Sequence, residues 1–355
     1  MISTIAPHPI NMDNIKDITN NLKKNVYKFH QFYNLEIEAA EYSFIEYMLL
    51  YKDSTRSKVL NKTYYDIETY VNEDGDFTDP DKADRPVNSI AVYNNIKNIA
   101  YVIAYVTDCD ITDPLIIEEG IRKMFDEKIQ ENETYNIEGI TLDIQIVADE
   151  KELLRTYFDI IKSLNTLAVI GFNSNTFDDP YMFNRTANLF GADAMKNIAS
   201  EFGIVDKYGN SSFELPDYLL VDLLKLYKPV GTGGGGLGKS LPDFKLNTVA
   251  YEELKITKLD LPGGFRHNYL HNIIGYLTYN IFDTLLTFKL DEKLMFMELM
   301  FDLSKYNNAT MGATINGRSI LYLYRNDLMY CSQNKIIRSK KFSQEVLFEP
   351  TIIVE

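Results

Sequence analysis

The spacing of hydrophobic positions changes near residue 61, and this change separates two kinds of structure. In residues 1–60 apolar side chains recur every three or four positions, as in V-Y-K-F-H-Q-F-Y and I-E-A-A-E-Y-S-F-I-E-Y-M-L-L-Y. This spacing is that of one face of a helix. It predicts a small N-terminal helical segment whose apolar face packs against the next domain.

From Lys62 onward the pattern is that of strands. Three successive strands are predicted at Thr63–Tyr70, Ser89–Asn94 and Ala100–Val106, which are rich in β-branched and aromatic residues. The insert between the first two strands is polar and contains five Asp and two Pro, and such a composition is typical of a solvent-exposed loop.

The middle of the chain alternates helices and strands. Helical spacing at Glu118–Glu131 and Lys151–Leu164 brackets an alternating strand at Thr141–Val147. The apolar run L-A-V-I-G-F-N, residues 167–173, is typical of a strand buried on both faces.

A further helix is predicted directly after this buried strand. Pro180 fits the first turn of a helix, and Asp178 or Asp179 can accept the hydrogen bond of an N-cap.

The second half of the chain is predominantly helical. Residues 218–227 (Y-L-L-V-D-L-L-K-L-Y) fit a strand or a helix, a short helix is predicted over residues 244–254, and a long helix from about Phe265 to Ser304. Residues from Thr314 onward indicate short strands and irregular chain. Strands and helices mixed in this order favour an α/β layer fold. We predict three segments: an N-terminal segment (1–60), a main domain (61–312) and a C-terminal extension (313–355).

The composition narrows the possible chemistry. A net charge of −15 argues against a protein that holds duplex DNA on a large basic surface. It does not exclude a nuclease, because a bound metal adds positive charge and bases can stack on the 25 Tyr and 20 Phe. The two cysteines set no disulfide framework, so we expect a reducing compartment, and the four histidines form no zinc pattern. Any bound metal is therefore expected to have oxygen ligands, which favours Mg²⁺ or Mn²⁺. The sequence has no apolar run that could cross a membrane and no recognisable signal peptide.

Two carboxylates in the first predicted strand are the first candidates for chemistry. Asp66 and Glu68 are two residues apart, so they lie on one face of a strand, while Ile67 points into the core. Like charges this close repel, and a divalent cation would remove the repulsion. A solvated strand edge is the alternative interpretation, because an acidic chain contains such triplets by chance.

Further carboxylates follow on two other predicted elements. Asp178 comes just after the buried strand, and Tyr279 and Asp283 are four residues apart on one face of the long helix. Four carboxylates on three elements are what a two-metal centre for phosphoryl transfer requires.

At this point the chain resembles a known family. D-I-E at 66–68, N-x-x-x-F-D at 173–178 and Y-x-x-x-D at 279–283 are similar, in this order, to three motifs of family B DNA polymerases. These are the Exo I, Exo II and Exo III motifs of the 3′-to-5′ proofreading exonuclease, of the tyrosine subgroup of DEDD nucleases. Their flanks, such as G-F-N-S-N-T-F-D-D-P-Y-M-F-N-R, resemble the replicative polymerases of T-even-like phages, from about Thr63 to the end of the chain.

The resemblance implies a ribonuclease-H-like exonuclease domain over 61–312, with a mixed β-sheet flanked by helices. It implies two Mg²⁺ or Mn²⁺ ions, and the residues that would hold them are Asp66, Glu68, Asp178 and Asp283. Tyr279 would orient the attacking water, and Asn173 and Phe177 would line the single-strand site. Taken alone, Tyr279 could simply pack its ring. Asp179 departs from the apolar residue expected after the second motif, and we interpret it as a cap rather than a fifth ligand.

The palm motifs of these polymerases, the aspartate before S-L-Y-P-S and the D-T-D triplet, do not occur in the sequence. We therefore expect either the exonuclease half of a split polymerase or a truncated chain, in the cytoplasm of a phage-infected bacterium. The expected partners are a single-stranded DNA 3′ end and a separate chain carrying palm, fingers and thumb. The alternative is a structural half of a split polymerase, whose exonuclease is weak or silent.

One further motif matches a known nucleotide-binding pattern in its residues but not in its sequence context. G-G-G-G-L-G-K-S at 233–240 satisfies the P-loop pattern, which requires a helix running directly from the Lys-Ser end. Here Leu241 and Pro242 follow, so we do not expect nucleotide binding at Lys239.

Overall fold

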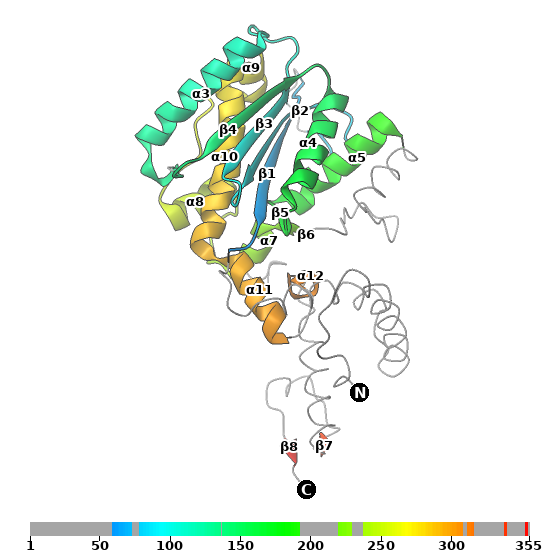
Figure 1. Cartoon of the computed structure of the whole chain (residues 1–355), viewed down its shortest axis with the longest axis vertical. Helices are drawn as coiled ribbons and strands as arrows, with labels where there is room; N and C mark the ends of the chain where they lie inside the picture. Colours follow the sequence, from blue (N-terminus) through cyan, green and yellow to red (C-terminus); the bar gives the residue numbers. More distant parts are fainter. Residues whose placement is uncertain are drawn as a thin grey trace, which may run out of the picture. The chain divides into compact units, whose positions relative to one another are not determined.

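Six strands of the unit formed by Val59–Glu298 pair into one mixed sheet, in the order β4-β3-β2-β1-β5-β6 (Figure 1). The strands are β1 (Lys62–Thr69), β2 (Val87–Asn94), β3 (Ile99–Tyr105), β4 (Thr141–Val147), β5 (Ala168–Gly171) and β6 (Leu219–Asp222). β1 and β3 each pair with β2 in antiparallel orientation, and the other neighbours are parallel. The predicted strands are confirmed to within one or two residues at their ends.

The computed structural model describes residues 59–72, 78–135, 137–191, 219–228, 237–307, 311–315, 337–338 and 352–353. The predicted N-terminal helical segment lies outside the described residues, as does most of the C-terminal extension. A second unit comprises Met1–Lys58 and Leu299–Glu355, and its described elements are most of α11 (Phe296–Asn307), α12 (Met311–Ile315), β7 (Ile337–Arg338) and β8 (Ile352–Ile353). The division into three predicted segments stays a prediction.

Helices cover both faces of the six-stranded sheet (Figure 1). They are α3 (Pro114–Glu131), α4 (Glu150–Leu164), α5 (Asp178–Phe190), α7 (Leu223–Tyr227), α8 (Leu246–Leu254), α9 (Gly264–His271) and α10 (Ile273–Leu294). Short 3₁₀ turns occupy Glu133–Tyr135 and Ser174–Thr176. None of the described helices is long and apolar enough to span a membrane. The predicted α/β fold is confirmed.

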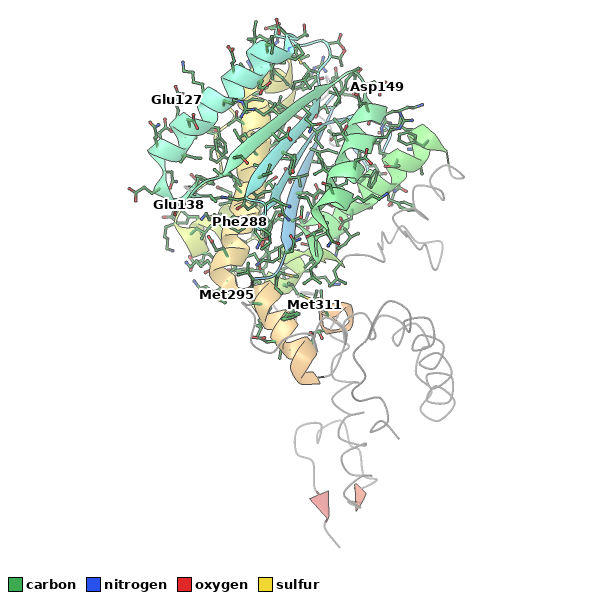
Figure 2. The ribbon with its side chains drawn as sticks, viewed as in Figure 1. Glu127, Glu138, Asp149, Phe288, Met295 and Met311 are labelled. Atoms are coloured by element: carbon green, nitrogen blue, oxygen red, sulfur yellow. The ribbon has the colours of Figure 1, made fainter. Side chains whose placement is uncertain are left out.

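The alternation of side chains along β1 assigns each face of the sheet to different helices. Tyr64 meets Phe288 of α10, with ring centroids 5.3 Å apart, and Tyr65 meets Tyr157 of α4 at 6.0 Å. Side chains fill the layers on both faces (Figure 2). Ile67 points to the α4 side and is 4% exposed in the core, as predicted. Asp66 and Glu68 therefore face α10.

The single long helix predicted from Phe265 to Ser304 is wrong, because the chain breaks at Asn272 and Met295. The Asn272 side chain caps α10 by accepting a hydrogen bond from the Gly275 amide at 3.3 Å. Met295 adopts a left-handed conformation with φ of 54°. The apolar spacing continues across both breaks, so periodicity alone could not reveal them.

The ambiguous run at 218–227 contains both predicted structures. It begins as β6 and continues as α7, and Asp222 caps the helix by accepting from the Leu224 amide at 2.9 Å. The predicted cap of α5 is wrong: the helix begins at Asp178 itself, and the N-cap residue is Phe177, whose side chain makes no capping bond. Pro180 lies in the first turn, as predicted.

The P-loop-like motif lies partly outside the described residues. Its described end carries Lys239, whose Nζ lies 2.9 Å from Glu252 Oε1 at the surface. The next helix, α8, begins only at Leu246. This part of the motif therefore lacks the helix start that phosphate binding requires.

Candidate metal centre

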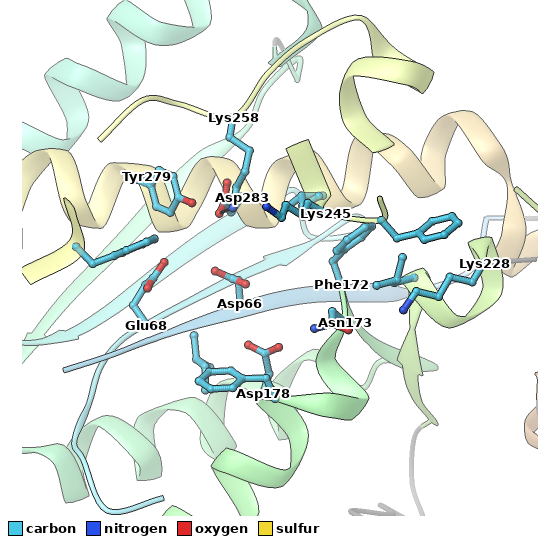
Figure 3. Close-up of a pocket in the computed structure, with 16 residues that line it drawn as sticks. Asp66, Glu68, Phe172, Asn173, Asp178, Lys228, Lys245, Lys258, Tyr279 and Asp283 are labelled. Carbon is cyan, nitrogen blue, oxygen red and sulfur yellow. Dashed lines mark ion pairs between the residues drawn. The ribbon is translucent and has the colours of Figure 1, made fainter. Parts of the chain in front are cut away.

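Three carboxylates meet where α10 passes over β1. Asp66 and Glu68 of β1 and Asp283 of α10 each offer an oxygen, and these oxygens all lie within 4.8 Å of one another (Figure 3). Asp283 is only 3% exposed. The strand period of two and the helix packed on that face bring together residues more than 200 positions apart.

Asp178 approaches the same place from the other side of the sheet. It is the first residue of α5, it is 7% exposed, and its side chain points toward Asp66 in Figure 3. Asp178 lies outside the close group of three, but its charge and those of Asp66 and Glu68 act on one another. The structure thus brings the four predicted carboxylates to one site.

The four carboxyl groups resist ionisation. Burial, followed by the neighbouring Asp283 charge, raises the pKa of Asp66 to about 7. Burial, followed by the other carboxylates, also raises the pKa of Glu68 and of Asp178 well above the ordinary values. The pKa of Asp283 is raised by burial, against the opposing effect of Lys258. A divalent cation would replace the protons that this arrangement otherwise favours.

Lys258 is a site residue that the sequence analysis missed. Its ammonium pairs with Asp283 Oδ2 and stands over the ring of Tyr279, 4.9 Å from the centroid. Burial by itself would lower the pKa of Lys258, but the surrounding carboxylates outweigh burial and raise it. Lys258 lies in irregular chain between α8 and α9, where no spacing could have distinguished it from other lysines.

Tyr279 both packs its ring and lines the site. The ring lies edge-on to Phe265, with centroids 5.8 Å apart, and the residue is 7% exposed. Tyr279 is one helical turn before Asp283, and both side chains border the cavity in Figure 3. The packing alternative for Tyr279 therefore does not exclude a role in the site.

A cavity of about 680 Å³ surrounds the carboxylates. Besides Tyr279, its aromatic and basic lining residues are Phe172, Phe177, Phe244, Phe265, Lys228, Lys245 and Lys258. Asn173 lines it too, and its backbone amide donates to Asp222 Oδ1 at 2.9 Å. Aromatic rings and lysines bordering one groove are suited to bases and phosphates of a single strand.

Asp179 does not line the cavity. Its buried carboxylate accepts a hydrogen bond from the Tyr65 hydroxyl, on the opposite face of β1 from Asp66. The interpretation of Asp179 as a helix cap is wrong, but this position agrees with the expectation that it is not a fifth ligand.

The donor set fits a hard divalent cation. All the converging groups are carboxylates, and oxygen ligands are those that Mg²⁺ and Mn²⁺ prefer. Asp283 Oδ1 is buried and has no hydrogen-bond partner among the described residues. A buried carboxylate oxygen without a donor is costly, and a bound cation would satisfy it.

Comparisons with known proteins identify the family of the chain. A model of the family described as DNA polymerase family B, exonuclease domain, matches residues 23–249. This range contains Asp66, Glu68 and Asp178, whereas Tyr279 and Asp283 lie beyond it.

Two relatives are DNA-directed DNA polymerases of phages. The polymerase of Escherichia phage RB69 is 27% identical over 263 residues, which are 72% of this chain and 27% of that protein. The polymerase of Enterobacteria phage T4 is 26% identical over 248 residues, 65% of this chain and 25% of that protein. The chain thus spans about a quarter of the length of these relatives. Because the family model covers more than half of its residues, and the mixed sheet is that of a ribonuclease-H-like domain, the chain belongs to the exonuclease-domain family of the family B DNA polymerases.

Proposed function

We propose that this chain is a 3′-to-5′ exodeoxyribonuclease that hydrolyses the terminal phosphodiester of single-stranded or frayed DNA with two divalent cations, Mg²⁺ or Mn²⁺. The observation that carries the proposal is the convergence of Asp66, Glu68 and Asp283 within 4.8 Å, with Asp178 bordering the same cavity. Such a density of buried negative charge is costly without a cation.

The four carboxylates would hold the cations. Bound divalent cations supply positive charge at the scissile phosphate and lower the pKa of the attacking water. Asp66 and Glu68 approach from β1, Asp283 from α10 and Asp178 from α5. Three separate elements would thus fix the ligands before substrate arrives, which limits the reorganisation needed during the reaction.

Tyr279 and Lys258 would act on the substrate side of the centre. The Tyr279 side chain borders the cavity beside Asp283, where its hydroxyl would orient water at the terminal phosphate. Lys258 pairs with Asp283 and would neutralise part of the phosphate charge when DNA enters. These two residues would therefore affect turnover more than folding.

The rest of the cavity would hold the DNA strand. Asn173 and Phe177 line it close to Asp178, and Lys228 and Lys245 line it beside Phe244. Bases would stack on the aromatic rings while lysines contact phosphates. Local positive charge of this kind is needed because the chain carries a net charge of −15.

The sequence contains no polymerase palm motif. We propose that the exonuclease works together with a separate polymerase chain that carries palm, fingers and thumb. A surface of that partner would supply further positive charge for DNA binding.

Digestion of a 5′-labelled single-stranded oligonucleotide by the isolated chain tests the proposal, with Mg²⁺, with Mn²⁺ and with EDTA. The expected result is a metal-dependent ladder that shortens from the 3′ end and disappears in the Asp66→Ala, Glu68→Ala variant. A Glu119→Ala, Asp126→Ala variant is the control, because it removes the same charge from the exposed face of α3.

Unchanged cleavage by the Asp66→Ala, Glu68→Ala variant would refute the site. Absence of any ladder from the wild-type chain, alone and with its polymerase partner, would favour the alternative function, a structural half with a silent exonuclease.

A further inference from the structure

A neutral side chain connects the metal centre to the second strand of the sheet. Asn280 of α10 donates from Nδ2 to Asp66 Oδ2 at 2.8 Å. Ser89 of β2 in turn donates from Oγ to Asn280 Oδ1 at 2.8 Å. Asn280 and Ser89 are both 0% exposed. The three residues form a chain of hydrogen bonds that links β2, α10 and β1.

The backbone explains why these residues meet. Ser89 is the register partner of Glu68 in the β1–β2 pair, so its side chain lies on the same face of the sheet as Glu68. Asn280 follows Tyr279 on α10, which packs on that face. Its amide therefore lies between Ser89 and Asp66, the two strand residues that it joins.

The Ser89 hydrogen bond fixes the direction of the Asn280 amide. A flipped amide would turn Oδ1 toward the Asp66 carboxylate, and two acceptors would then face each other. With Oδ1 occupied by the Ser89 hydroxyl, Nδ2 is held toward Asp66. Asp66 Oδ2 is thereby engaged, and no described residue donates a hydrogen bond to Asp66 Oδ1.

The neutrality of Asn280 matters as much as its geometry. A buried lysine or arginine at this position would pair with Asp66, as Lys258 pairs with Asp283, and would cancel its charge. An amide orients the carboxylate and leaves its charge available. Partners of this kind behind a metal ligand set its orientation and affinity.

We propose that Ser89 and Asn280 are positioning residues of the metal centre, which hold Asp66 by Oδ2 so that Oδ1 is presented to a divalent cation. The inference rests on the proposed function, because it assumes that Asp66 is a metal ligand. It predicts that both residues affect metal affinity without touching metal or DNA.

Mn²⁺ binding, followed by electron paramagnetic resonance of the free ion, tests this proposal on the full chain without DNA. Binding by the Asp66→Ala, Glu68→Ala variant measures surface sites and is subtracted. Asn280→Ala is expected to weaken Mn²⁺ binding by about 10- to 100-fold, the usual effect of losing such a partner. Ser89→Ala is expected to weaken binding by less than about tenfold, because it frees the amide but keeps the donor.

Thr278→Val is the matched control. Thr278 lies on the same helix, it is 0% exposed, and its hydroxyl has no hydrogen-bond partner among the described residues. This variant is expected to bind Mn²⁺ as the wild-type chain does. Cleavage by Asn280→Ala is expected to recover at saturating Mn²⁺, because the ligands themselves are intact.

Wild-type Mn²⁺ affinity in Asn280→Ala would overturn the proposal, as would an equal loss of affinity in Thr278→Val. If Asn280→Ala does not fold, the Mn²⁺ affinity of Ser89→Ala tests the proposal. An unchanged Mn²⁺ affinity in Ser89→Ala would then overturn it. Mn²⁺ binding without DNA cleavage, both alone and with the polymerase partner, would refute the exonuclease and leave the positioning role intact. Absence of Mn²⁺ binding to the wild-type site would refute both.

Discussion

The strand β1 and the helix α10 meet in two buried polar clusters, and the clusters differ in how charge is balanced. At the first, Lys62 Nζ lies 2.7 Å from Asp291 Oδ2 and 2.7 Å from Glu298 Oε1, and the Tyr64 hydroxyl donates to Asp291 Oδ2 at 2.7 Å. At the second, Asp66, Glu68 and Asp283 converge with Lys258 as the paired cation. We call the first the lysine cluster and the second the carboxylate cluster.

The lysine cluster contains its own cation, although Glu298 Oε2 is buried without a hydrogen-bond partner among the described residues. Lys62 is 4% and Asp291 0% exposed, so neither charge is solvated by water. Burial by itself would lower the pKa of Lys62, but Asp291 and Glu298 outweigh it and raise the pKa. Such a pair is worth little over an apolar contact, but removing one member is costly.

In the carboxylate cluster three carboxylates, Asp66, Glu68 and Asp283, converge around the paired cation Lys258. Its carboxyl groups have raised pKa values, and Asp283 Oδ1 has no hydrogen-bond partner among the described residues. The same strand and helix, β1 and α10, thus carry one polar cluster that stabilises the fold and another that is suited to binding a metal. The difference is whether the chain itself supplies the balancing charge.

The largest effect on stability is expected at the lysine cluster. Lys62→Met would leave Asp291 buried without its cation and destabilise the chain by about 3–5 kcal/mol. Urea unfolding measures the change, and cleavage per folded molecule should be unaltered. Lys62→Met with Asp291→Leu should recover most of the loss. A single variant as stable as the wild-type chain would contradict the assignment.

Metal removal should make the carboxylate cluster destabilising as pH rises. A carboxyl whose pKa is higher in the folded than in the unfolded chain imposes no penalty below the unfolded value, and its full penalty above the folded one. For Asp66 these values are 3.8 and about 7. Stability in EDTA should therefore fall between about pH 4 and pH 7, by an amount on the order of a few kcal/mol.

Mg²⁺ should remove this loss, because the cation replaces the protons. Urea unfolding across this pH range, with Mg²⁺ and with EDTA, measures both curves. Coincident curves would contradict a metal centre.

Replacing the site carboxylates by alanine should stabilise the metal-free chain, whereas most substitutions of buried residues destabilise a protein. In EDTA at pH 7, Asp66→Ala with Glu68→Ala is expected to raise the free energy of unfolding by at least about 1 kcal/mol, because like charges no longer repel. The gain should vanish near pH 4, where the wild-type carboxyls are protonated. Thermal unfolding at the two pH values checks this, and a loss of stability at pH 7 would show that the carboxylates are balanced without metal.

The smallest effect on stability is expected at an exposed ion pair, which serves as a reference for the two buried clusters. Lys123 Nζ lies 4.0 Å from Glu127 Oε1 on α3, and the two side chains are 79% and 58% exposed. Lys123→Ala should change the free energy of unfolding by less than about 0.5 kcal/mol. A larger change in urea unfolding would mean that exposure is a poor guide to the value of ion pairs here.

Local periodicity accounts for the faces on which the candidate ligands lie. Asp66 and Glu68 share a face because strand side chains alternate, and Tyr279 and Asp283 share one because they are four residues apart on a helix. The strands were predicted for the same reason. The breaks at Asn272 and Met295 were not, because they depend on a capping side chain and a left-handed residue that leave the apolar spacing unchanged.

The sequence by itself therefore determined the strands of the sheet, the faces on which the candidate ligands lie and, through three motifs, the exonuclease family. Only the tertiary structure decided which charges are balanced. Lys258 meets Asp283, Asn280 meets Asp66 and Lys62 meets Asp291 across separations that carry no spacing signal. Such pairs arise when α10 and the segment before α9 pack on the sheet, and the energy of a buried charge depends on that packing rather than on neighbours in sequence.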